Sequence, residues 1–173
     1  PNIEIQDPKI TKFGNYWFIT YTGGVLRTAD FFSWQLVSIG ATNKYKQITA
    51  PSLIHDSDKL MMSFSSYDAK GNYDAYIAPF NYDTSKPNLK KALKLQGLHN
   101  VNAVDIYKGA RKYYALYTKN KKGSGKIFIA TAKKITGKYS TIRKITPPTG
   151  MYYYAPTFLQ NQASKIIGIM YSS

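Results

Sequence analysis

The chain has 173 residues and no cysteine, and its 24 Lys and Arg residues against 9 Asp and Glu residues give a net charge of +15. With 43% apolar and 15% aromatic residues, it is too apolar for a disordered basic tail and long enough for a sizeable core. The lack of cysteine excludes a disulfide framework, a zinc site built on thiolates and a thiol nucleophile. No apolar run approaches the roughly 20 residues of a membrane-spanning helix, so we expect no membrane span.

Short segments rich in Tyr, Phe, Ile, Val and Thr recur between clusters of turn-forming residues, and this pattern predicts an all-β protein. Helical spacing is confined to residues 88–95, where we expect at most one or two helical turns. In chain order, the predicted strands include residues 16–22, 24–28, 60–65, 73–78, 113–118, 126–131 and 166–172.

The strands fall into repeated units. Four similar segments begin near residues 7, 50, 102 and 155, at intervals of 43, 52 and 53 residues, and three of them carry a Pro at the same place. Units of about 40 to 50 residues with three or four strands are typical of propeller blades. We therefore predict a β-propeller-like domain over residues 1–173 with about three and a half blades, and a β-sandwich is the alternative. Because such a ring cannot close by itself, the chain is interpreted as a fragment or as one part of a homo-oligomer.

Three segments carry a resemblance to a known family. The run from Asp7-Pro8 to Thr22 resembles the first blade of the five-bladed β-propeller glycoside hydrolases, and family 43 (arabinanases, arabinofuranosidases and xylosidases) has the most similar pattern. Residues 26–34 and 50–54 are similar to its later first-blade and second-blade segments. The resemblance implies a truncated or catalytically degenerate member of that superfamily.

The family's chemistry needs carboxylates, because one group protonates the leaving oxygen and another activates water. By resemblance, Asp7 matches the general base. Asn102 stands where the family has a second aspartate, and Tyr154 stands where the family has the glutamate that acts as general acid. Asp105 replaces Asn102 if the alignment is shifted, whereas the only glutamate is Glu4 in the first blade. One of three expected carboxylates is therefore matched.

Aromatic and polar residues at the later repeat starts are candidates for contacting a sugar. We predict Asn102, Asp105, Tyr153 and Tyr154 as substrate-binding residues. Both tryptophans, at positions 17 and 34, are expected in the core. The two histidines lack ligand partners at metal-binding spacing, so we expect no metal and no cofactor.

Charge is concentrated in the second half of the chain. Residues 1–100 carry +3, whereas residues 101–173 carry +12. Such a field attracts polyanions, and anionic glycans or wall polymers are stronger candidates than nucleic acid; a solvated lysine-rich surface is the alternative interpretation. The predicted polyanion-binding residues are Lys119, Lys121, Lys122, Lys126, Lys133 and Lys134.

These features together predict a secreted or cell-surface protein that binds carbohydrate and lacks hydrolysis. The first alternative is an active glycosidase that cleaves arabinose- or xylose-containing glycans with Asp7 as general base. The second is a basic surface adhesion or polyanion-binding module.

Overall fold

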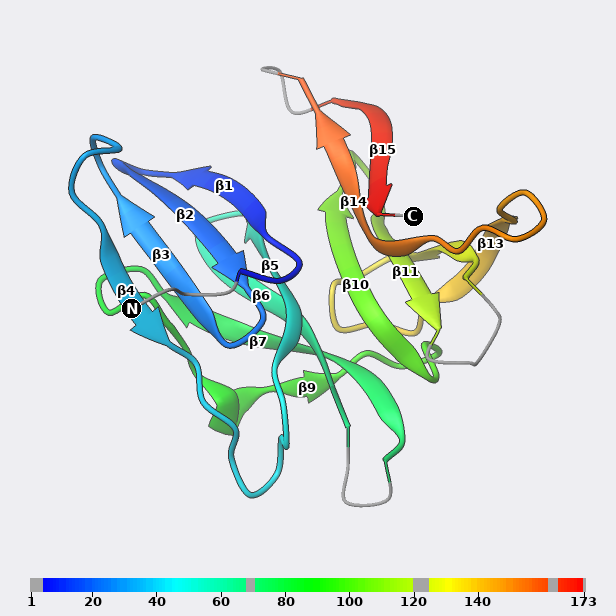
Figure 1. The fold of residues 1–173 in the computed structure, drawn as a ribbon, viewed down its shortest axis with the longest axis horizontal. Coiled ribbons are helices and arrows are strands. Elements are labelled where there is room, and N and C mark those ends of the chain that lie inside the picture. Colours follow the sequence, from blue (N-terminus) through cyan, green and yellow to red (C-terminus); the bar gives the residue numbers. More distant parts are fainter. Residues whose placement is uncertain (1–4, 68–70, 120–124, 162–164, 173) are drawn as a thin grey trace.

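The computed structural model describes residues 5–67, 71–119, 125–161 and 165–172. They form four antiparallel sheets that follow one another along the chain (Figure 1). The first sheet contains β1 (Lys9–Phe13), β2 (Tyr16–Tyr21), β3 (Gly24–Thr28) and β4 (Gln35–Ser38). The second contains β5 (Thr49–Asp56), β6 (Lys59–Tyr67), β7 (Tyr73–Asn81) and β8 (Lys86–Pro87), with β9 (Leu93–Lys94) also paired to β7. The third contains β10 (Val101–Lys108), β11 (Tyr113–Lys119), β12 (Ile127–Ala132) and β13 (Ser140–Ile145), and the fourth contains β14 (Tyr154–Gln160) and β15 (Ile166–Ser172).

The all-β prediction is confirmed, and local sequence explains the elements. In the β1–β2 hairpin, Phe13 pairs with Tyr16 across a two-residue turn. Gly14 in that turn has φ of +56°, a left-handed conformation that glycine adopts without steric cost and that favours the twist of a tight hairpin. Of the segment expected to be helical, only Leu89–Lys91 forms one short 3-10 turn, η1.

Hydrophobic layers join each sheet to the next. Phe18, Met62 and Phe64 are fully buried in the layer between the first and second sheets. The layer between the second and third contains Ile77, Leu95, Leu98, Val104 and Tyr117, and that between the third and fourth contains Leu116, Ile127 and Tyr153. Because each blade buries its faces against its neighbours, the sheets stabilise one another in sequence.

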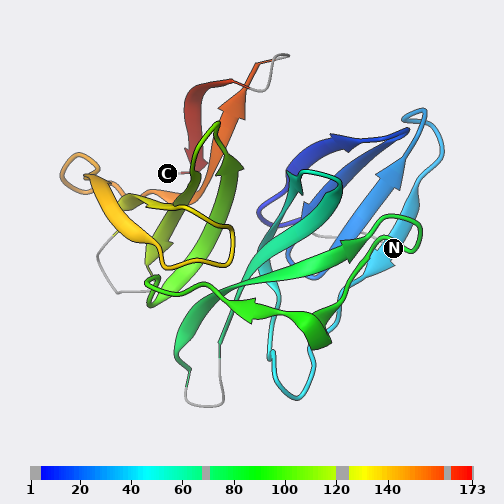
Figure 2. The ribbon, with the colours of Figure 1, turned by 180° about the vertical axis from the view of Figure 1, so that it is seen from behind.

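The first strands of the four sheets run in the same direction around a common centre. Ser52 of β5 contacts Asp105 of β10, and further along both strands Asp56 contacts Lys108. Phe13 at the end of β1 similarly packs against His55 near the end of β5, with ring centroids 4.8 Å apart. The first sheet lies on one side of the molecule and the third and fourth on the other, as both views show (Figures 1 and 2). This is the arrangement of a partial β-propeller, as predicted.

No helix in the described part of the chain is long and apolar enough to cross a membrane.

Candidate functional site

One carboxylate joins all four sheets near their common centre. Asp105 Oδ1 accepts a hydrogen bond from Ser52 Oγ at 2.6 Å, and Oδ2 accepts from Thr157 Oγ1 and from the Phe158 backbone N–H, both at 2.8 Å. Lys9 Nζ lies 4.0 Å from Oδ1. These partners belong to the first, second and fourth sheets, and Asp105 belongs to the third. Asp105, one of the predicted substrate-binding residues, is only 6% exposed, and its contacts connect the four sheets.

Lys9 is buried beside this carboxylate. Its ammonium also donates to the Pro156 carbonyl at 3.4 Å. Burial lowers the pKa of Lys9, and the nearby charges of Asp105 and Asp7 act in the opposite direction. The centre therefore holds a desolvated cation whose main compensation is Asp105.

The backbone repeats an unusual conformation where the four central strands begin. Asp7, Ala50, Asn100 and Ala155 have φ values of +53°, +44°, +57° and +41°. Each such residue costs on the order of 1 kcal/mol outside glycine. Register irregularities follow in β5, β10 and β14, and bulges of this kind re-aim side chains and are frequent beside functional sites. We call this end of the sheets the strand-start end.

Asp7 lies at the strand-start end between the first and second sheets. Its Oδ2 accepts from Thr22 Oγ1 at 3.3 Å, and that hydroxyl accepts from the Ala50 N–H at 3.2 Å. Asn102 occupies the irregular start of β10 and is half-buried. Since the central strands are parallel, Asp7 and Asn102 lie at the same end of the molecule.

The tyrosines before the fourth sheet alternate in exposure. Tyr152 and Tyr154 are 43% and 49% exposed, and their rings lie nearly parallel with centroids 6.4 Å apart. Tyr153 is 9% exposed and packs against Tyr171 at 4.1 Å. The predicted sugar contact at Tyr153 is therefore a buried packing residue. Tyr152 is not among the predicted binding residues, although alternation along an extended chain places it on the face of Tyr154.

Few other carboxylates reach this end. Glu4 lies outside the described residues. Among the described residues, Asp7 is the only acidic side chain in the two positions before a central strand or at its first residue. Of the carboxylates that the resemblance implies, Asp7 is therefore the one that the described residues match at this end.

The predicted polyanion-binding lysines are divided between the two ends of the third sheet. Lys119 ends β11 and Lys126 precedes β12, so both lie at the strand-start end, and Lys119 Nζ is 4.9 Å from the Phe128 ring centroid. Lys133 and Lys134 are exposed beyond the opposite end of β12. Lys121 and Lys122 lie outside the described residues.

A polar cluster links the second and third sheets at the end opposite the strand starts. Asp56 Oδ1 accepts from Lys108 Nζ at 2.9 Å and from Tyr113 Oη at 2.6 Å. Burial raises the pKa of Asp56, but these hydrogen bonds together with the charges of Lys108 and Lys59 outweigh it, so that the pKa is lowered. Burial and then the hydrogen bond to Asp56 raise the pKa of Tyr113 to about 12.

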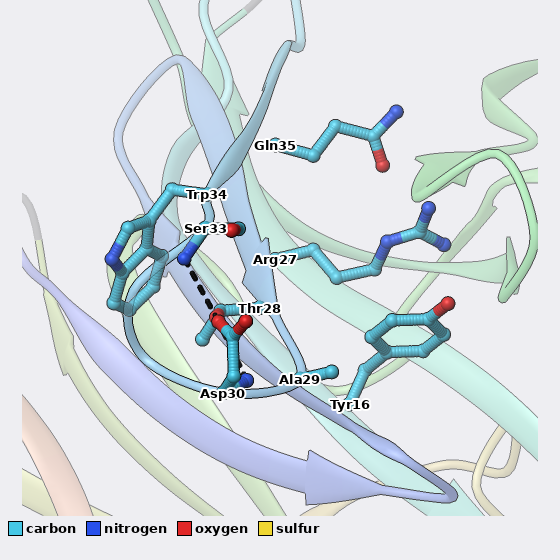
Figure 3. Close-up of a pocket in the computed structure, with 8 residues that line it drawn as sticks. All are labelled: Tyr16, Arg27, Thr28, Ala29, Asp30, Ser33, Trp34 and Gln35. Carbon is cyan, nitrogen blue, oxygen red and sulfur yellow. Dashed lines mark hydrogen bonds between the residues drawn. The ribbon is translucent and has the colours of Figure 1, made fainter.

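A shallow hollow of about 290 Å³ opens on the first sheet (Figure 3). Its lining includes Tyr16, Arg27, Asp30, Trp34 and Gln35. Trp34 is 42% exposed, so the prediction that it belongs to the core is wrong. The reason is that an Asp30-capped turn carries Trp34 past the edge of the hydrophobic layer, where its Nε1 donates to the Phe31 carbonyl at 3.1 Å.

Within the described ranges, no group of three or more His, Cys, Asp or Glu side chains is placed to hold a metal ion.

Solved structures of glycoside hydrolases share this fold. An α-L-arabinofuranosidase from Clostridium thermocellum matches with a TM-score of 0.67 and 16% sequence identity, over 90% of this chain and 57% of that chain. A family 32 β-fructofuranosidase from Bombyx mori matches with a TM-score of 0.54 and 19% identity, over 85% of this chain and 38% of that chain. No family model and no curated protein matches the sequence.

The chain therefore spans about two fifths of one neighbour and less than two thirds of the other. At these identities the likeness is one of fold. The chain has the blade arrangement of the family 43 and family 32 glycoside hydrolase propellers, with three full sheets and a two-stranded fourth.

Proposed function

We propose that this chain binds carbohydrate at the strand-start end of its sheets. The observation that carries the proposal is the exposed, nearly parallel pair of Tyr152 and Tyr154, at the same end as Asp7 and Asn102. Aromatic faces pack against the apolar faces of sugar rings, and carboxylate and amide groups hydrogen-bond to hydroxyls. The two neighbours named above are an arabinofuranosidase and a fructofuranosidase, so furanose-containing glycans are the first ligands to test.

Hydrolysis by the described chain is not part of this proposal. Asp7 can act as a general base, but a glycosidase also needs an acid on the other side of the bond. Tyr154 occupies the position that the resemblance assigns to that acid, and Asp105 is committed to hydrogen bonds within the protein.

The test uses arabinan oligosaccharides and inulin oligosaccharides with the intact chain. Calorimetric titration should show saturable binding that survives 0.5 M salt, about the concentration at which exposed charge interactions are largely screened. Replacing Tyr154→Ala should weaken binding about fivefold to tenfold, equivalent to about 1 to 1.4 kcal/mol. Leu93→Ala is the control, because Leu93 is 54% exposed on β9 of the second sheet and lies outside the proposed site.

Failure of both ligands to bind would contradict the proposal. Release of sugar by the wild type and its loss in Asp7→Asn would replace it with the active-glycosidase alternative.

A second candidate function is the binding of an anionic polymer by the third and fourth sheets. Residues 101–173 contain 13 Lys and Arg residues and a single acidic residue, Asp105. Because Asp105 is buried and paired with Lys9, no acidic side chain in this half offsets the cationic surface. An anionic wall polymer or acidic glycan is the expected partner, which fits the predicted secreted or cell-surface location.

Polygalacturonate is a suitable probe for this second function. Its affinity should fall steeply with added salt, unlike that of a neutral glycan. The double variants Lys119→Ser/Lys126→Ser and Lys133→Ser/Lys134→Ser form a matched pair that distinguishes the two ends of the sheet. Binding that does not change with salt or with either double variant would exclude this function.

A further inference from the structure

The hollow on the first sheet lies away from the strand-start end. Thr22 contacts Asp7 where β2 ends, whereas Tyr16 begins β2 and lines the hollow. β2 spans six residues, which is about 20 Å at 3.3 Å per residue. The hollow and the Tyr152–Tyr154 pair are therefore separate surfaces.

An aromatic platform with fixed orientation forms one wall. The Trp34 indole donates to the Phe31 carbonyl at 3.1 Å, and its ring meets the Phe31 ring edge-on at 6.0 Å. Nearly half of Trp34 stays exposed. Since the side chain is already held in place, a ligand that stacks on it loses little affinity to ordering the indole.

A pre-organised guanidinium forms the opposite wall. Arg27 Nη1 donates to the carbonyls of Tyr82 at 3.0 Å and Asp83 at 2.9 Å, and the guanidinium carbon lies 4.4 Å from the Tyr16 ring centroid. These contacts use the two hydrogens of Nη1. Among the described residues, neither Nε nor Nη2 has a hydrogen-bond partner, and these two atoms form the forked donor edge of an arginine.

An ionised carboxylate supplies acceptors between the two walls (Figure 3). Asp30 Oδ1 accepts from the backbone N–H groups of Ser33 at 2.8 Å and Phe32 at 2.9 Å. These two hydrogen bonds hold the pKa of Asp30 below its usual value. Its Oδ2 has no hydrogen-bond partner among the described residues. The exposed amide of Gln35 adds both a donor and an acceptor.

We propose that this hollow is a second carbohydrate site, which binds one neutral sugar unit of a glycan. The ring stacks on Trp34, its hydroxyls donate to Asp30 and accept from Arg27, and Gln35 completes the polar edge. A neutral polyol fits this mixture of donors and acceptors, whereas the charge of Asp30 disfavours a carboxylate or phosphate. The volume of about 290 Å³ suits one sugar unit, because pockets for larger ligands begin near 300 Å³.

The two tryptophans make the test specific, because Trp17 and Trp34 give the only indole signals of the chain. In ¹⁵N-labelled protein, arabinan and inulin oligosaccharides should shift the Trp34 indole signal saturably, with Trp17→Phe used to assign it. Gln35→Ala, at an exposed position, should weaken this titration at least threefold with an unchanged unfolding temperature. Tyr154→Ala should leave it unchanged, so this site and the proposed function fail independently.

Two outcomes would overturn the second site. One is an unmoved Trp34 signal with both ligands at about 10 mM, a concentration that would saturate even a site of millimolar Kd. The other is a titration that Tyr154→Ala abolishes and Gln35→Ala leaves intact.

Discussion

Removing the charge of Asp105 should destabilise the whole molecule, because this side chain joins four sheets. In Asp105→Asn the amide keeps the side chain's shape and can still accept from the Phe158 N–H. The charge-assisted hydrogen bonds become neutral ones of roughly half the strength. Lys9, 4.0 Å from Oδ1, becomes a buried cation without its main counter-ion.

The expected loss follows from these contacts. We expect Asp105→Asn to lower the free energy of unfolding by about 2 to 3 kcal/mol. Asp105→Ala should lower it by about 3 to 5 kcal/mol, the usual cost of removing one partner of a buried ion pair. A domain of this kind has a total stability of about 5 to 15 kcal/mol, so either loss is large. Ser52→Ala, which removes one hydrogen bond and no charge, should cost about 1 to 2 kcal/mol.

The ion pair makes a further, more discriminating prediction. Lys9→Met should be less destabilising in the Asp105→Asn background than in the wild type, since it then removes an unpaired buried charge. A coupling free energy of at least about 1 kcal/mol is expected from the double-mutant cycle.

Urea unfolding measures the free energy of unfolding of the wild type and of each variant. Tryptophan fluorescence follows the first sheet, and far-ultraviolet circular dichroism follows all sheets. Coincident transitions would show that the sheets unfold together. Two results would refute the role assigned to Asp105. One is a free energy of unfolding for Asp105→Asn within about 0.5 kcal/mol of the wild type, and the other is an equal effect of Lys9→Met in both backgrounds.

Three further predictions concern other contacts. The pKa of Tyr113 rises from 10.0 to about 12 on folding. The stability that its protonated hydroxyl contributes through Asp56 is therefore complete below pH 10 and is lost as the pH rises through 12. Tyr113→Phe should remove this loss when the free energy of unfolding is measured from pH 8 to 12, and an unchanged pH profile would contradict the prediction. Gly97→Ala should lower the free energy of unfolding by at least about 2 kcal/mol, because Gly97 has φ of +82° and an added methyl group would collide with the Tyr139 carbonyl. A thermal midpoint equal to that of the wild type would disprove this prediction. Ile167 on β15 is 62% exposed. If the predicted homo-oligomer covers this sheet, Ile167→Lys should be a monomer in sedimentation velocity. A wild type that is itself a monomer would argue against assembly.

Local patterning explains how far the sequence predicts the site. The repeat starts predict that Asp7, Asn102 and Tyr154 lie where central strands begin, because Pro and turn residues mark those positions. Sequence could not decide which tyrosine of the adjacent run faces out, because a shift of one residue moves a side chain to the other face of a strand. The structure exposes Tyr152 and buries Tyr153.

The all-β class and the repeated units could be predicted from the sequence, because strand patterns and turn residues act over a few neighbouring positions. The roles of Asp105 and of the first-sheet hollow depend instead on contacts between sheets. Lys9, Asp105 and Thr157 are about 50 or more residues apart in the chain, and they meet because parallel central strands bring equivalent positions of successive sheets to one centre. Arg27 is likewise held by carbonyls of the second sheet, and no pattern within the first sheet predicts such contacts.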